Sequence, residues 1–267
     1  MNHAEHLRNE GYVLISNVFT AEETRLLRER AEQAFAVPSR NPDDGDENYI
    51  RQHLGVEFRG SNRSLILIRN PEFRSFIFHK GFADALAAVL GPEFVVFPDG
   101  GLQKANYGGW HKDTGYQESQ GQFWHYKPGY QVVTFVIYLQ DNNEYGGGLD
   151  VRPKSHLQPN PTRFLERVKR RLGVKPPQYA EVSVPNKAGD VLVFDQRLFH
   201  RATPPKVVPV PPGNEKIGLF MSASRNNEFA RPYMDVLRAR PELKFLASYT
   251  SPPELIDLAR RSGITLL

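Results

Sequence analysis

Hydrophobic positions follow a helical spacing near both ends of the chain and a strand-like spacing between them. Close to the N-terminus, the apolar run Gly11–Ser16 predicts a short strand. Thr20 and Glu23 then form the sequence pattern of a capping box, so we expect a helix that continues to about Phe35. Residues 38–47 are polar and rich in proline and glycine, which is typical of a loop.

The apolar spacing of residues 71–90 predicts a second helical region, interrupted near Gly81. Short apolar segments separated by turn residues follow and predict a β sandwich or barrel rather than a parallel sheet with crossover helices. These expected strands are Phe94–Phe97, Gly101–Tyr107, Gln131–Leu139, Leu149–Arg152, Glu181–Val184, Asp190–Phe194 and Lys216–Ser224.

No repeat or linker divides the sequence, so we expect a single domain over residues 1–267. Its expected parts are an N-terminal helical region (1–92), a β core (93–225) and C-terminal helices (226–267). A basic segment with helical spacing is expected as an insertion in the core, near residues 162–172.

Composition narrows the chemistry that is open to this chain. Its 267 residues include no cysteine, which excludes disulfides, thiolate metal sites and cysteine nucleophiles. Any metal must therefore be bound by carboxylates and the eight histidines. The net charge of +4 is weak evidence for nucleic acid as a partner. The sequence has no apolar run of membrane-spanning length and no signal-peptide pattern, so we expect a soluble, cytoplasmic protein.

Three residues form the strongest candidate site. His111 and Asp113 lie two positions apart in GGWHKDTGY, and in a strand-like segment their side chains would share one face. His200 ends a second apolar segment in GDVLVFDQRLFHRATPP. Two imidazoles and one carboxylate can form the facial triad of non-haem Fe(II) oxygenases. The sequence therefore predicts an iron site at these three residues.

Four segments, in this order, resemble the phytanoyl-CoA dioxygenase-like (PhyH) family of Fe(II)- and 2-oxoglutarate-dependent oxygenases. They are GYVLISNVFTAEE, GGWHKD, YLQDNNEYGGGLDVRPKSH and AGDVLVFDQRLFHRATP. The resemblance implies a mainly β fold with flanking helices around a double-stranded β-helix, the cupin-like jelly roll. It also implies that His111, Asp113 and His200 hold Fe(II), with 2-oxoglutarate and O2 as co-substrates.

The family anchors the distal carboxylate of 2-oxoglutarate with a basic residue, usually arginine, at the start of the strand that follows the distal histidine. Here Lys216 occupies that place, and Arg225 at the far end of the same strand is the alternative. Lysine supplies a point charge without the bidentate fork of arginine. Further co-substrate contacts implied by the resemblance are Gln103, Lys104, Asn106 and Thr203.

The sequence also offers candidates for substrate binding. Arg51, Arg59 and Arg63 lie between the two N-terminal helical regions, which in this family help to roof the active site, and they would suit an anionic substrate. Aromatic residues near the iron segment are candidates for the pocket wall, namely Trp110, Trp124 and the adjacent His125. Each of these residues could equally be an ordinary surface or core residue.

The expected function is hydroxylation of a small organic substrate, with anionic compounds as the candidate class, and release of succinate and CO2. A carboxylate at position 113, rather than alanine or glycine, argues against a halogenase. Two alternatives stay open: a cupin-type metal-dependent isomerase or hydrolase that does not use 2-oxoglutarate, and a catalytically silent binding module. The sequence names neither the substrate nor the oligomeric state.

Overall fold

A computed structural model describes residues 2–39, 48–51, 57–159, 171–172, 179–240, 243 and 246–267; the side chains of 48–51 and 57–59 are outside this description. The helices are α1 (His3–Glu10), α2 (Ala21–Ala36), α3 (Ile66–Arg69), α4 (Arg74–Ile77), α5 (Lys80–Leu90), α6 (Gly115–Ser119), α8 (Ala230–Ala239) and α9 (Pro253–Arg261). Short 3-10 turns are η1 (Pro71–Phe73), η2 (Trp124–Tyr126) and η3 (Ser155–Leu157).

The strands are β1 (Tyr12–Ile15), β2 (Asn48–Arg51), β3 (Glu57–Ser64), β4 (Phe94–Val96), β5 (Gly101–Lys104), β6 (Val132–Tyr138), β7 (Leu149–Arg152), β8 (Val182–Ser183), β9 (Val191–Asp195), β10 (Phe199–Ala202), β11 (Ile217–Arg225) and β12 (Thr265–Leu266). Within the described ranges they form two sheets. The nine-stranded sheet has the order β1-β9-β6-β11-β5-β3-β2, with β4 and β12 attached beside β11, and the three-stranded sheet has the order β10-β7-β8.

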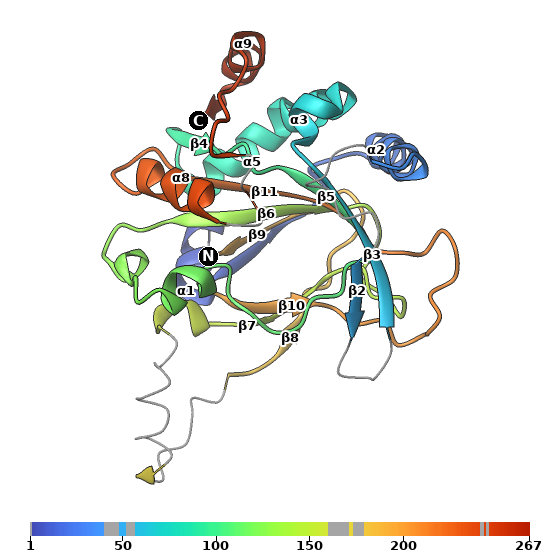
Figure 1. The fold of residues 1–267 in the computed structure, drawn as a ribbon, viewed down its shortest axis with the longest axis horizontal. Helices are drawn as coiled ribbons and strands as arrows, with labels where there is room; N and C mark the ends of the chain where they lie inside the picture. The colour runs from blue at the N-terminus through green and yellow to red at the C-terminus, as the bar shows by residue number, and fades with distance from the viewer. Residues whose placement is uncertain are drawn as a thin grey trace.

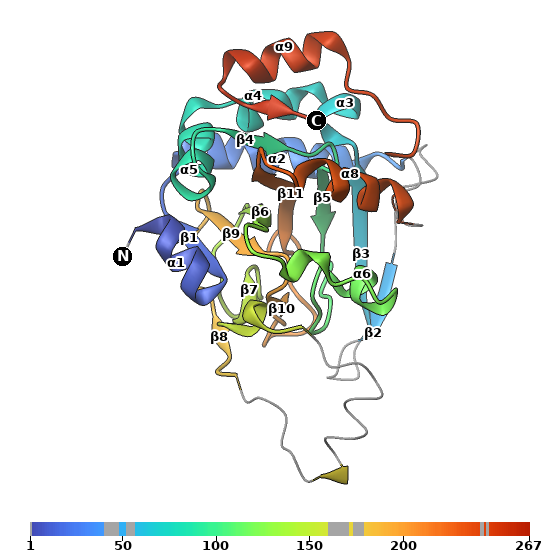
Figure 2. The ribbon, with the colours of Figure 1, turned by 90° about the vertical axis from the view of Figure 1, so that its left-hand side faces the viewer.

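The two sheets lie one above the other, and helices cover the outer face of the larger one. Figure 1 shows β7, β8 and β10 below β6, β9 and β11, with α2, α3 and α5 above them. Figure 2 shows α9 outside this helical layer, above α4. This arrangement of antiparallel strands is a jelly roll, and the predicted fold class is confirmed.

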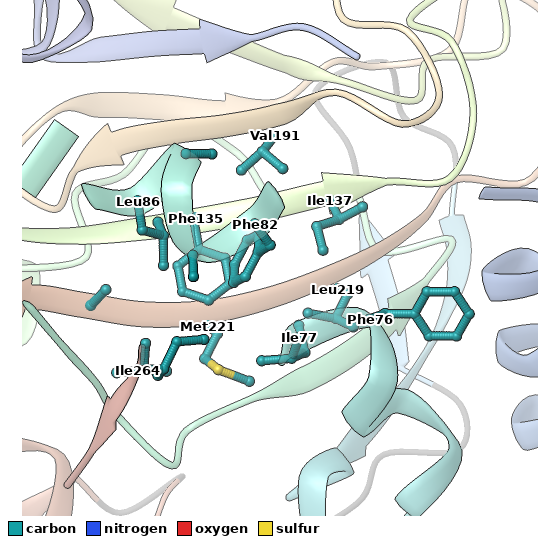
Figure 3. Packing of buried hydrophobic residues seen from close by; sticks show 14 of the residues in the cluster. Phe76, Ile77, Phe82, Leu86, Phe135, Ile137, Val191, Leu219, Met221 and Ile264 are labelled. Atoms are coloured by element: carbon teal, nitrogen blue, oxygen red, sulfur yellow. The ribbon is translucent and has the colours of Figure 1, made fainter. Parts of the chain in front are cut away.

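Strand β6 is buried on both faces, and its side chains alternate between two cores. Phe135 and Ile137 point to the helical layer, where Phe135 packs against Phe82 of α5 with ring centroids 4.8 Å apart. Figure 3 shows this packing. Val136 and Tyr138 point the other way, toward the smaller sheet. Because side chains alternate along a strand, one apolar strand fills both layers.

The N-terminal elements follow the sequence predictions. Thr20 Oγ1 accepts a hydrogen bond from the backbone N–H of Glu23, and the Glu23 carboxylate accepts one from the backbone N–H of Thr20. This capping box begins α2 at Ala21. Leu27 and Ala31 of α2 are fully buried in the core that α2 shares with the larger sheet.

One prediction for the N-terminal region is wrong, and one prediction for the core lies outside the described residues. Residues 1–92 are not only helical beyond β1, because β2 and β3 form an antiparallel hairpin and β3 pairs with β5. Strand β3, EFRGSNRS, has no regular apolar alternation, so the pairing comes from backbone hydrogen bonds that the side-chain pattern does not reveal. The expected helical insertion at 162–172 lies almost entirely outside the described residues.

The C-terminal part contains α8 and α9, as expected, and also β12, which pairs parallel to β4. Within the part of the chain that the structure covers, every helix is too short or too polar to cross a bilayer.

Candidate metal centre and its cavity

A cavity of about 320 Å³ opens between the two sheets. Strand β11 and its neighbours β5 and β6 form one wall, and β10 with the loop before α6 forms the opposite wall. The lining residues are Asp99, Gln103, Asn106, Gly108, His111, Asp113, Thr134, Tyr138, Leu149, Phe194, Gln196, His200, Ala202, Lys216, Phe220, Met221, Ser222, Tyr233 and Arg240. All three predicted iron ligands are among them.

The side chains of His111, Asp113 and His200 converge on one point of this cavity. One ligand atom from each residue lies within 4.8 Å of the other two. Nε2 of His111 is 3.7 Å and Nε2 of His200 is 3.6 Å from Oδ1 of Asp113. The His200 side chain is 5% exposed, whereas that of His111 is 50% exposed, so the site is closed on one side and open on the other.

Backbone carbonyl groups fix the orientation of both imidazole rings. Nδ1 of His111 lies 2.7 Å from the carbonyl oxygen of Gly109, and Nδ1 of His200 lies 2.9 Å from that of Leu198. A carbonyl can only accept, so each Nδ1 carries a hydrogen, and in the neutral tautomer the lone pair is then on Nε2, which faces Asp113. Burial also lowers the pKa of His200 to about 4, which keeps this ring neutral at pH 7.

Asp113 is oriented by a buried polar network. Thr134 Oγ1 donates to Oδ2 of Asp113 at 2.7 Å. Gln196 Nε2 lies within hydrogen-bond distance of Thr134 Oγ1 (3.3 Å), Ser222 Oγ (3.1 Å) and Tyr233 OH (2.6 Å). Oδ1 of Asp113 therefore remains directed at the imidazoles while Oδ2 is held from behind.

The backbone between His111 and Asp113 is not a strand, so that prediction is wrong. His111 forms an isolated bridge with His200, with reciprocal N–H···O distances of 2.9 and 3.0 Å, and a turn begins at Asp113. The intervening Lys112 is buried, and its Nζ donates to Tyr126 OH and to the carbonyls of Ser155 and Gln158. The ligands therefore converge because the His111–His200 bridge and the hydrogen bonds of Lys112 fix this segment, and not because side chains alternate along a strand.

Two imidazole nitrogens and one carboxylate oxygen fit the donor set of a non-haem Fe(II) centre. Such a facial triad leaves the opposite side of the metal open to other ligands. Hydrogen bonds to the far side of each ligand, as seen here at all three residues, are the usual support of a metal site.

Lys216 lies in the same cavity and is 2% exposed. Its Nζ faces the rings of Tyr107 and Tyr138 at 5.4 and 5.8 Å from their centroids. No carboxylate within the described residues forms an ion pair with it, and burial lowers the pKa of Lys216 to about 7. A buried amine in this setting would gain from an anionic ligand.

The other predicted co-substrate residues divide into two groups. Gln103 and Asn106 line the cavity and contact each other, with Asn106 Nδ2 donating to Gln103 Oε1. Lys104 instead pairs with Glu215 at 3.8 Å, and Thr203 donates to Asp150. Arg225 is exposed at the end of β11, outside the cavity lining.

Of the predicted substrate residues whose side chains the structure describes, none lines the cavity. Arg63 is buried against the end of α2, where it donates to the carbonyls of Ala34 and Val37. The guanidinium groups of Arg152 and Arg201 both lie over the ring of Trp110, while Trp124 stacks on Phe229. His125 is fully buried, 3.5 Å from Glu118. The side chains of Arg51 and Arg59 lie outside the described residues.

Several residues of the cavity were not among the candidates predicted from the sequence. Thr134 had a detectable signal, because it is the one polar residue in the apolar run Val132–Leu139 apart from the tyrosine hydroxyl. Asp99, Gln196, Ser222, Tyr233 and Arg240 had none, since they reach the cavity from separate loops, a strand and a helix end.

Comparison with known proteins supports this reading of the fold. A family model described as Phytanoyl-CoA dioxygenase (PhyH) matches residues 7–206. No curated protein sequence gives a significant match.

Three similar solved structures cover most of the chain. The non-heme alpha ketoglutarate dependent epimerase SnoN from nogalamycin biosynthesis has 18% identity and a TM-score of 0.59, covering 84% of this chain and 82% of that chain. EctD from S. alaskensis, solved with 2-oxoglutarate and 5-hydroxyectoine, has 20% identity and a TM-score of 0.56 (83% and 74% covered). The carbocyclase SnoK, also from nogalamycin biosynthesis, has 21% identity and a TM-score of 0.54 (86% and 88% covered). At these identities the likeness establishes the fold alone.

Proposed function

The chain belongs to the phytanoyl-CoA dioxygenase (PhyH) family, and from this premise we propose that it hydroxylates a small organic substrate with Fe(II), 2-oxoglutarate and O2. Its general class is that of the Fe(II)- and 2-oxoglutarate-dependent oxygenases. The observation that carries the proposal is the convergence of His111, Asp113 and His200 in a cavity that also contains the buried amine of Lys216.

His111, Asp113 and His200 are the proposed ligands of Fe(II). Because backbone carbonyls accept from the Nδ1–H groups, the two histidines would bind the metal through Nε2. Asp113 would supply the one negative charge, through the oxygen that Thr134 leaves available.

Lys216 is the proposed partner of the distal carboxylate of 2-oxoglutarate. Its amine faces the cavity, whereas Arg225 is exposed at the other end of β11. Ionisation of Lys216 is costly while it is buried alone, so a carboxylate ligand would restore the charged form. Gln103 and Asn106 line the same cavity and are proposed to contact the co-substrate.

Bound Fe(II) would supply the redox chemistry, in which one O2 oxidises 2-oxoglutarate to succinate and CO2 and places its second oxygen atom in the substrate C–H bond. The chain's own residues bind and orient the two organic molecules. Phe194, Phe220 and Leu149 keep part of the cavity wall apolar, which limits the access of water.

The test is a measurement of succinate release together with identification of the product by mass spectrometry. Wild-type protein with Fe(II) and 2-oxoglutarate should release succinate, and Asp113→Ala should lose both iron binding and turnover. Asp235→Ala, an exposed carboxylate on α8, is the matched control. Full iron binding and turnover in Asp113→Ala would contradict the proposal. Product identification is needed because proteins of this fold are described as an epimerase and a carbocyclase.

A further inference from the structure

The cavity has a second charged end, remote from Lys216. Lys216, directly before β11, and Ser222 of β11 both line the cavity and are six positions apart, which corresponds to roughly 20 Å along an extended chain. Ser222 pairs in register with Thr134, whose hydroxyl holds Asp113. The metal ligands are therefore near the Ser222 end, and the groups beyond them are placed to meet a substrate.

Asp99 is the negative group at this end. Its Oδ2 accepts a hydrogen bond from Ser222 Oγ at 2.5 Å, and its Oδ1 accepts one from the backbone N–H of Ser222 at 2.9 Å. These two contacts fix the plane of the carboxylate and leave each oxygen with further capacity to accept. Asp99 lines the cavity, and burial raises its pKa to about 6, against the effect of the nearby Arg240.

Arg240 is the positive group, and it enters the cavity directly after the end of α8. Its Nη2 lies 3.4 Å from the backbone carbonyl oxygen of Asp113, so the guanidinium is adjacent to the metal-ligand segment. Arg240 also lowers the pKa of Asp99 through its charge. It lies beyond residue 206, where the match to the family ends, so this group is not part of the matched family pattern.

The neutral polar groups at this end of the cavity are largely occupied by one another. Gln196 Nε2 is directed at Tyr233 OH, Ser222 Oγ and Thr134 Oγ1. Recognition at this end of the cavity therefore depends mainly on the carboxylate of Asp99 and the guanidinium of Arg240.

We propose that this end of the cavity binds a small zwitterion of the α-amino-acid type, with its carboxylate on Arg240 and its ammonium group on Asp99. The proposal rests on the oxygenase function proposed above. A carboxylic acid without an amino group would add a second negative charge beside the buried Asp99. An amine without a carboxylate would add a second positive charge beside the guanidinium of Arg240. Both arrangements are unfavourable because like charges repel and one buried charge is left unpaired. A zwitterion pairs with both groups and forms charge-assisted hydrogen bonds to each.

The size of the cavity agrees with such a substrate. About 320 Å³ is at the lower end of the range for small-molecule sites, and 2-oxoglutarate must share this space. An amino acid is of similar size to 2-oxoglutarate.

The test uses isothermal titration calorimetry under anaerobic conditions, with protein that carries Fe(II) and 2-oxoglutarate. The probes are the twenty standard L-amino acids. For each amino acid that binds, two analogues are also titrated: the carboxylic acid that lacks the amino group, and the amino acid amide that lacks the carboxylate. Glucose is the neutral polar control. We expect at least one amino acid to bind and both of its analogues to bind roughly 10- to 100-fold more weakly. Succinate release is measured in parallel.

Variants assign the two charges. Arg240→Gln should weaken amino-acid binding roughly 10- to 100-fold, and Asp99→Asn should do the same independently. Arg238→Gln and Asp235→Asn, an exposed pair on α8, are the matched controls and should bind like wild type. Iron content and melting temperature show whether each variant is folded. If one of the two site variants does not fold, the amino-acid affinity of the other variant tests the proposal.

The outcomes separate this proposal from the proposed function. If no amino acid binds, if analogues with one charge or glucose bind as well, or if the folded site variants bind like wild type, the zwitterion proposal is overturned. Substrate-free conversion of 2-oxoglutarate to succinate would still support the oxygenase function in each of these cases. Loss of that conversion in wild type, with amino-acid binding intact, would overturn the oxygenase function alone.

Discussion

Thr134 and Asp113 are joined by a hydrogen bond of 2.7 Å that links the centre of the larger sheet to the proposed metal site. Thr134 belongs to β6, whose other side chains are apolar or aromatic, and it faces the cavity on the same side as Tyr138. The sheet thus determines the direction of the one carboxylate in the triad.

Thr134→Val removes this hydrogen bond while nearly preserving side-chain shape. We expect iron affinity to fall roughly 10- to 100-fold, because hydrogen bonds behind a metal ligand orient it. Competition with a chelator of known affinity measures the effect. Thr134→Ser retains the hydroxyl and should bind iron like wild type. An unchanged affinity in the valine variant would mean that Asp113 is held by other contacts.

Lys216→Met replaces the buried amine by an apolar side chain of similar length. We expect binding of 2-oxoglutarate to weaken by at least about tenfold through the loss of a charged hydrogen bond. Because the pKa of Lys216 is lowered to about 7, wild-type protein must take up a proton to bind the carboxylate above that pH. Wild-type affinity should therefore fall from pH 7 to pH 9 more steeply than that of the variant. Calorimetry at several pH values compares the two, and parallel curves would exclude Lys216 as the anchor.

Asp99→Asn tests how much free energy of unfolding is lost by burying an ionised carboxylate at this position. The pKa of Asp99 is raised from 3.8 to about 6 in the folded protein, so the native state binds more protons than the unfolded state between these values. The free energy of unfolding should consequently fall as pH rises from about 4 to about 6 and stay lower above it. At pH 7.5 the variant should be more stable than wild type by roughly 1 to 3 kcal/mol, with a smaller difference at pH 4.5.

Chemical denaturation at the two pH values gives these free energies. Asp235→Asn on the surface of α8 should leave the pH profile unchanged. A variant less stable than wild type at pH 7.5 would show that the contacts of Asp99 with Ser222 outweigh the cost of burying its charge.

Phe135→Ala removes the ring that joins β6 to α5. Phe135 is fully buried, and its ring packs against Phe82 (Figure 3), so we expect a loss of about 3 to 5 kcal/mol in unfolding free energy. Leu157→Ala, at a side chain that is 59% exposed, should change it by less than about 0.5 kcal/mol. Similar losses in both variants would contradict the assignment of the core to this layer.

The apolar strands were predictable because their signal is local. Val132–Tyr138 and Val191–Asp195 are buried on both faces, so each is an apolar run, interrupted only by Thr134 and ended by Asp195, that can be recognised without its partners. The helix after Thr20 was equally predictable, because a capping box needs only residues three positions apart. Strand β3 was missed because its polar sequence is held by backbone pairing with β5.

The sequence by itself determined the apolar strands of the two sheets, but not β2, β3, β10 or β12. It also singled out His111, Asp113, His200 and Lys216, because residue type and chain order carry that information. Only the tertiary structure decided how the three candidate ligands converge, through the bridge between His111 and His200 and the hydrogen bond from Thr134. It alone brought Asp99 and Arg240 to the same cavity. Such contacts join residues far apart in the chain, and their direction depends on how sheets, loops and helix ends pack, which no local pattern encodes.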